Sequence, residues 1–198
     1  MSDLCYADRM KHLHKTSLVT FFAATVLTAP TAFGQVVVQG EGDAALCYNS
    51  ALSGNMGSRS AVRTCTEALS QALSRKDTAA TFVNRGVLHM RADRQIEASS
   101  DYESALAIRP ELTEAHINYG ASLIQQGRDA EAMKAMNAAL SDRESTKLPE
   151  AYYNRAILHE RAGDVRAAYF DLRSALELRP DWPPALTSIA RFDVKRKS

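Results

Sequence analysis

Two stretches of the chain are near copies of each other: residues 82–110 read FVNRGVLHMRADRQIEASSDYESALAIRP, and residues 152–180 read YYNRAILHERAGDVRAAYFDLRSALELRP. A more diverged third copy lies between them, at residues 116–144. Repetition at this length predicts an array of one helical supersecondary unit, because such a unit buries its apolar face only against its neighbours. An array of this kind offers an extended surface for holding other molecules.

Small residues recur at the same three places in every unit. They are Gly86, Gly120 and Ala156, then Ala98, Ala132 and Ala168, then Ala105, Ala139 and Ala175. Residues of this size suit points where two helices approach each other closely. Pro110 and Pro180 follow the second helix of the first and third units, where a proline prevents the helix from continuing.

With a period of about 34 residues, this pattern resembles the tetratricopeptide repeat family. The resemblance implies an all-α fold, an antiparallel helix-hairpin solenoid stacked as a right-handed superhelix and closed by a C-terminal capping helix. It divides the chain into repeats at residues 79–112, 113–148 and 149–182, a degenerate N-terminal capping hairpin at residues 44–75, and a capping segment at residues 183–198. The second repeat carries a short insertion, and the last helix is expected to run from Pro183 to Lys195.

The N-terminal residues indicate export. A basic segment at residues 10–15 precedes an apolar run at residues 18–27, and small residues follow up to Gly34. This order is typical of a secretory signal peptide, and the apolar run is too short for a stable bilayer span. We expect residues 1–34 to be the signal peptide, with an over-long start before Met10; an uncleaved N-terminal anchor is the alternative.

The exported protein would begin with a flexible leader at residues 35–43. We expect it in the periplasm of a Gram-negative bacterium, with no membrane span once the signal is removed. Two cysteines then remain, Cys47 and Cys65, on either side of a turn at residues 53–58. In an oxidising compartment they predict a disulfide across the capping hairpin, worth about 3 kcal/mol. Two buried reduced thiols are the alternative.

Charged residues recur together in the first and third repeats: Arg85 with Asp101, and Arg155 with Asp171. In the middle repeat both places change together, to Tyr119 and Ala135. We therefore predict a partly buried ion pair within each of the two outer hairpins, which sets the helix register. Arginines reserved for an acidic ligand are the alternative. His89 and His159 also recur, but they are two repeats apart, so we predict no metal site and no cofactor.

The resemblance assigns the inner, concave face of the stack to the first helix of each repeat. Apolar residues with scattered charges occupy that face: Val83, Val87, Met90, Arg91, Ile117, Ala121, Ile124, Tyr153, Ile157 and Arg161. They predict a groove for an extended or helical peptide, unless the curvature of a short array buries part of the set. Asn84, Asn118 and Asn154 recur beside it, but no lysine precedes them, so we predict no clamp for a peptide carboxylate.

The charge balance argues against a nucleic-acid binder, because 24 Lys and Arg residues face 23 Asp and Glu residues in a chain of 198 residues. The sequence contains no Gly-rich phosphate loop, no Gly-x-Ser-x-Gly and no His-Glu-x-x-His motif. We therefore predict a non-catalytic scaffold or adaptor of the cell envelope that binds a protein or peptide partner, and not an enzyme. The alternatives are a structural subunit that self-associates and a helical enzyme that modifies the cell wall.

Overall fold

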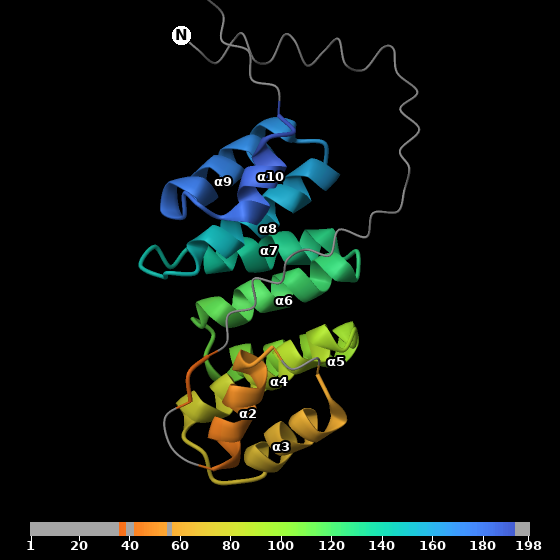
Figure 1. The fold of residues 1–198 in the computed structure, drawn as a ribbon, viewed down its shortest axis with the longest axis vertical. Coiled ribbons are helices and arrows are strands. Elements are labelled where there is room, and N and C mark those ends of the chain that lie inside the picture. The colour runs from red at the N-terminus through yellow and green to blue at the C-terminus, as the bar shows by residue number, and fades with distance from the viewer. Residues whose placement is uncertain (1–35, 39–41, 55–56, 193–198) are drawn as a thin grey trace, which may run out of the picture.

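The computed structural model describes residues 36–38, 42–54 and 57–192, so the predicted signal peptide lies outside the described residues. The helices are α2 (Asp43–Leu52), α3 (Arg59–Leu69), α4 (Arg75–Arg91), α5 (Gln95–Ile108), α6 (Thr113–Gln125), α7 (Asp129–Ala139), α8 (Leu148–Arg161), α9 (Val165–Leu178) and α10 (Pro183–Ile189). The described ranges contain no strand. Figure 1 shows the helices stacked along the long axis of the molecule, which confirms the predicted all-α solenoid of hairpins.

Consecutive helices pair as hairpins, α2 with α3, α4 with α5, α6 with α7 and α8 with α9. The second helix of each hairpin also packs on the first helix of the next, and α9 packs on α10 in the same way. The first helices contact one another directly, from α2 to α4, from α4 to α6 and from α6 to α8. They form a continuous inner layer, and the second helices form the outer layer.

Each hairpin turns at a residue with a left-handed backbone. Gly127 and Gly163 take this conformation after α6 and α8, with φ of 71° and 78°. In hairpin α4–α5 the equivalent residue is Asp93, with φ of 57°. Aspartate tolerates this backbone conformation better than most residues other than glycine. Side-chain caps start α4 and α9, where Ser74 and Asp164 accept hydrogen bonds from backbone N–H groups of the first turn.

The two helices of a hairpin fit by matching a small residue on one to a large residue on the other. A Cβ placed on Gly86 would lie 2.5 Å from the ring of Tyr102, which is fully buried. A Cβ on Gly120 would collide with the terminal methyl group of Met136. In the third hairpin the small residue is Ala156, which shares a buried cluster with the smaller Leu172. The close packing of the interior therefore requires these small residues.

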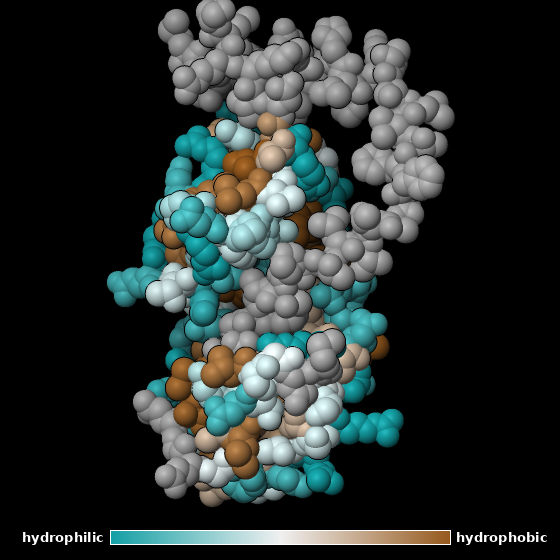
Figure 2. Space-filling model, in the orientation of Figure 1, coloured by the Kyte–Doolittle hydropathy of each residue, from teal (hydrophilic) through white to brown (hydrophobic). Residues whose placement is uncertain are grey.

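The two ends of the array differ from its middle. Figure 2 shows apolar surface gathered toward both ends of the described array. Leu46 and Leu52 on α2, and Phe170, Leu178 and Leu186 on α9 and α10, are large apolar side chains that are exposed, as is Ile96 on α5. End hairpins lack an outer neighbour, so exposure of this kind is expected there. Helix α10 ends at Ile189, with turn and bend residues at 190–192, whereas Lys195, its expected end, lies outside the described residues.

Candidate functional site

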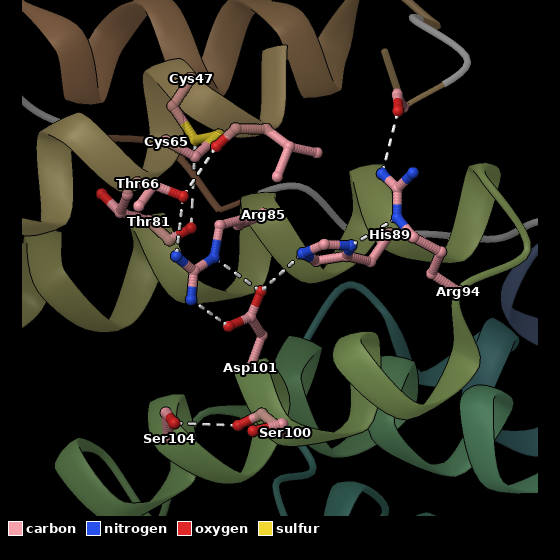
Figure 3. A network of polar contacts seen from close by, with 12 residues as sticks. Cys47, Cys65, Thr66, Thr81, Arg85, His89, Arg94, Ser100, Asp101 and Ser104 are labelled. Atoms are coloured by element: carbon pink, nitrogen blue, oxygen red, sulfur yellow. Dashed lines mark hydrogen bonds and ion pairs between the residues drawn. A yellow bond between two sulfur atoms is a disulfide. The ribbon is translucent and has the colours of Figure 1, made fainter. Parts of the chain in front are cut away.

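The N-terminal hairpin contains the two cysteines for which the sequence predicts a disulfide. Cys47 lies on α2 and Cys65 on α3, both fully buried, and their sulfur atoms are 2.09 Å apart in a disulfide (Figure 3). The bond joins the two helices of this hairpin, and both helices pack against α4. It therefore stabilises the hairpin next to the candidate site.

An arginine and an aspartate pair within each outer hairpin. The Arg85 guanidinium donates two hydrogen bonds to the Asp101 carboxylate, at 2.9 and 2.6 Å (Figure 3). Arg155 donates the same two bonds to Asp171, at 2.8 and 2.7 Å. The aspartate side chains are only 5% and 8% exposed, so each fork-shaped contact is shielded from solvent.

The same arginines also reach the preceding hairpin. Arg85 donates to Thr66 Oγ1 at 3.0 Å, and Arg155 donates to Asn137 Oδ1 at 2.9 Å. These bonds link each hairpin to the outer helix of its neighbour. The guanidinium groups thus make their hydrogen bonds within the fold, which argues against the alternative that they bind an acidic ligand.

Tyr119 stands at the equivalent place in the middle hairpin. Its hydroxyl donates to Glu103 Oε1 at 2.5 Å, on the outer helix of the preceding hairpin. Desolvation and this hydrogen bond raise the pKa of Tyr119 to about 12, so the hydroxyl remains a donor at neutral pH. A neutral side chain therefore makes the inter-hairpin contact that an arginine makes on either side.

The two arginines predicted in the groove bind backbone carbonyls. Arg91 donates to the Ala51 carbonyl at 2.6 Å, and Arg161 donates to the Ile124 carbonyl at 2.9 Å and to Asp129 at 2.7 Å. Both carbonyls lie at the C-terminal end of the preceding inner helix, where a cation is favoured. These side chains connect successive inner helices.

The apolar part of the predicted groove is mostly interior. Six of its residues are less than a tenth exposed: Val83, Val87, Met90, Ile117, Ile124 and Tyr153. Tyr153, for example, packs edge-on against Trp182, with ring centroids 5.1 Å apart. Ala121 and Ile157 are half-buried. The open lining is narrower than the sequence suggested, because the inner helices of this short array touch one another.

The residue that binds an extended segment is Asn84, on α4. Its Oδ1 atom accepts a hydrogen bond from the N–H of Val36 at 3.1 Å, and its Nδ2 atom donates to the carbonyl of Val36 at 3.0 Å. Asn84 is fully buried. One side-chain amide thus satisfies both backbone groups of a residue 48 positions away.

The sequence contained a signal for this contact, the asparagine that recurs in every repeat. The absence of a lysine beside the asparagines argues against a carboxylate clamp, but it does not argue against binding of peptide backbone. A neutral amide is sufficient to bind a peptide group, since it carries one acceptor and two donors.

The segment Val36–Val38 is neither helix nor assigned strand, and its side chains alternate in exposure. Val38 is 9% exposed and packs in a cluster with Ala44, Ala68 and Ala80, whereas Val37 is 58% exposed. Val36 packs against that cluster and against the main core of the first hairpin. Alternation with a period of two is the pattern of a strand laid on a surface.

The described residues contain no group of three possible metal ligands. Within the same residues, no helix is both long enough and apolar enough to cross a bilayer.

Comparison with known proteins extends this description. The family model for the tetratricopeptide repeat matches residues 149–181. No curated protein matches the chain significantly. Among solved structures, Pseudomonas aeruginosa PilF is 21% identical, with a TM-score of 0.65 over 75% of this chain and 65% of that one.

Two further structures are similar to the chain and carry peptide sites by their own description. YrrB, a TPR protein with an unusual peptide-binding site, is 20% identical, with a TM-score of 0.58 over 73% of each chain. The first TPR domain of Spaghetti (RPAP3), bound to the HSP90 peptide SRMEEVD, is 21% identical, with a TM-score of 0.53 over 57% of this chain and 88% of that one. Identities this low establish the fold alone. The third hairpin matches the tetratricopeptide repeat, and the described array that repeats this hairpin has the tetratricopeptide-repeat fold.

Proposed function

We propose that this protein is a non-catalytic adaptor that binds an extended segment of a partner protein along its inner helices. The observation that carries the proposal is the pairing of the buried Asn84 amide with the backbone of Val36. An amide that binds both the backbone N–H and the backbone carbonyl of one residue recognises extended backbone of any sequence, and neighbouring apolar positions then select side chains.

The electrostatics of the site favour an internal segment over a chain end. Arg91 and Arg161, the cations predicted for the groove, are held by backbone carbonyls. A free carboxylate would need an available cation beside the asparagine. The partner segment we propose is therefore neutral at the point of contact.

The structural relatives support peptide binding by analogy. YrrB and the RPAP3 domain are both described as peptide-binding, and tetratricopeptide arrays commonly mediate protein–protein contacts. Fold analogy alone does not supply a ligand, so the argument for this chain rests on its own Asn84 contact.

We place the protein in the cell envelope, exported and periplasmic. The order of basic, apolar and small residues before Gln35 supports this location. The pair of cysteines in the capping hairpin also supports it, because disulfides persist in oxidising compartments.

The test is photo-crosslinking in an envelope extract, followed by mass mapping of the attached segment. Wild type and an Asn154→Ala variant, altered at the equivalent place of the third hairpin, should capture the same segment, and Asn84→Ala should lose it. Thermal melts establish that both variants fold. Equal capture of that segment by all three proteins contradicts the proposal. Ile117 and Tyr153, although predicted to line the groove, are not useful positions for this test. Both side chains are buried, so an aspartate at either position would unfold the array.

Light scattering over a range of concentrations distinguishes the alternative of self-association. The exposed apolar side chains on α2 and α10 lie where two copies would meet end to end. A mass that stays that of one chain supports a monomeric adaptor.

A further inference from the structure

The segment at Val36–Val38 contacts α4 as a bound peptide would. It is separated from Asn84 by 48 positions in sequence, its side chains alternate in exposure, and its main contact uses backbone atoms. The chain thus places one of its own strands on the site where the proposed partner binds.

The side chains of this segment define what the site accepts. Val36 and Val38 face the protein and pack against small residues, Ala44, Ala68 and Ala80. Val37 points outward and is 58% exposed. Three alanines form the centre of the receiving surface, and Tyr48 and Leu73 pack at its margin. Such a surface fits compact β-branched side chains at alternate positions and places no demand on the residue between them.

The contact is suited to exchange. It consists of two backbone–amide hydrogen bonds, the burial of Val38 and the partial burial of Val36, each a modest contribution. Residues 39–42 connect the segment to α2, so it is held near the site at an effective concentration of the order of millimolar. Asn84 is fully buried in this arrangement, and a buried amide without a hydrogen-bond partner is costly. The site therefore favours being occupied, either by this segment or by a replacement for it.

We propose that Val36–Val38 is a tethered ligand that occupies the Asn84 site in cis, and that the partner segment is an extended strand with β-branched residues at alternate positions, which displaces it. This inference rests on the proposed function. It adds the chemistry of the partner segment. It also adds a competition, because the protein binds that segment more weakly while Val36–Val38 occupies the Asn84 site.

The test measures binding of a labelled peptide, QVVVQGEGD, which copies residues 35–43, to the full chain by fluorescence anisotropy. Val38→Asp should release the segment, because a carboxylate cannot remain in that apolar cluster, and should bind the peptide about tenfold or more tightly than wild type. Val37→Asp is the matched control, with the same substitution one residue away on the exposed side, and should bind as wild type does. Adding Asn84→Ala to Val38→Asp should abolish binding.

Hydrogen exchange at the Val36 N–H, measured by NMR, reports occupancy directly. Exchange should be slow in wild type and in Val37→Asp, and fast in Val38→Asp and Asn84→Ala. Fast exchange in wild type, together with equal peptide affinities of wild type and Val38→Asp, overturns the tethered ligand and leaves the crosslinking test of the proposed function standing. A Val38→Asp protein with a released segment that fails to bind the peptide overturns the assigned partner chemistry.

Discussion

The first and third repeats differ from the middle repeat in the contact that joins their two helices. In α4–α5 and in α8–α9, a bidentate arginine–aspartate pair joins the two helices, with a histidine nitrogen 3.8 or 3.7 Å from the carboxylate. In α6–α7 the equivalent places hold Tyr119 and Ala135. All three hairpins nevertheless stack in the same way. The ion pair is therefore an addition to the fold, and the match of small to large side chains is its basis.

The three junctions have one contact in common. The side chain at this place, Arg85, Tyr119 or Arg155, makes a hydrogen bond to the outer helix of the preceding hairpin, at Thr66, Glu103 or Asn137. The middle hairpin differs in having no ion pair between its two helices at this place, and Leu123 in place of the histidine. Substitutions can test how much of the stability the ion pair supplies.

The largest expected effect comes from Asp171→Ala. Arg155 would lose its carboxylate while its guanidinium stays mostly buried, so we expect the free energy of unfolding to fall by about 2–3 kcal/mol. Urea denaturation followed by circular dichroism measures it. In the middle hairpin, Ala135→Asp alone should also destabilise, and Tyr119→Arg combined with it should recover at least half of the loss. A double variant no more stable than Ala135→Asp alone would contradict a transferable ion pair.

Gly86→Ala and Gly120→Ala should differ, although both add one methyl group at the same place. The new Cβ at Gly86 meets the buried Tyr102 ring, which has no room to move, so we expect a loss of about 1–3 kcal/mol. At Gly120 the nearest atom is the end of the flexible Met136 side chain, so the loss should stay below about 1 kcal/mol. Chemical denaturation of the two variants side by side measures the difference, and equal losses refute this account.

The smallest effect is a pH dependence that arises in hairpin α4–α5, at His89. Burial lowers the pKa of His89, as do Arg94 and Arg85, against the opposing effect of Asp101. Its Nδ1 atom accepts a hydrogen bond from Arg94 Nε at 2.9 Å, which a protonated ring could not do (Figure 3). Because the folded pKa lies below the unfolded one, the unfolded chain takes up the proton first. Stability is therefore present above about pH 6.5 and is lost as the pH falls below it.

Unfolding free energies at about pH 7.5 and about pH 5.5 test this sign. Wild type should lose more stability on acidification than His89→Gln, which cannot take up the proton. Identical losses in the two proteins would show that His89 does not contribute to the pH dependence.

The sequence was sufficient to infer the array, because its features repeat. The small residues at Gly86, Gly120 and Ala156, and the joint change to Tyr119 and Ala135, are visible as a comparison of the chain with itself. The lining of the groove was not inferable to the same degree. The exposure of Ile117 or Tyr153 depends on how closely successive inner helices approach each other. Many side-chain contacts together set that spacing.

The formation of hairpins and the register in which they pair follow from the sequence, since helical periodicity and the size of residues at the crossing points act over short distances. The contact of Val36 with Asn84, and those of Arg91 and Arg161 with carbonyls, follow from the folded arrangement. These contacts join residues far apart in the chain, and they exist only because the stacking of whole hairpins brings their elements together.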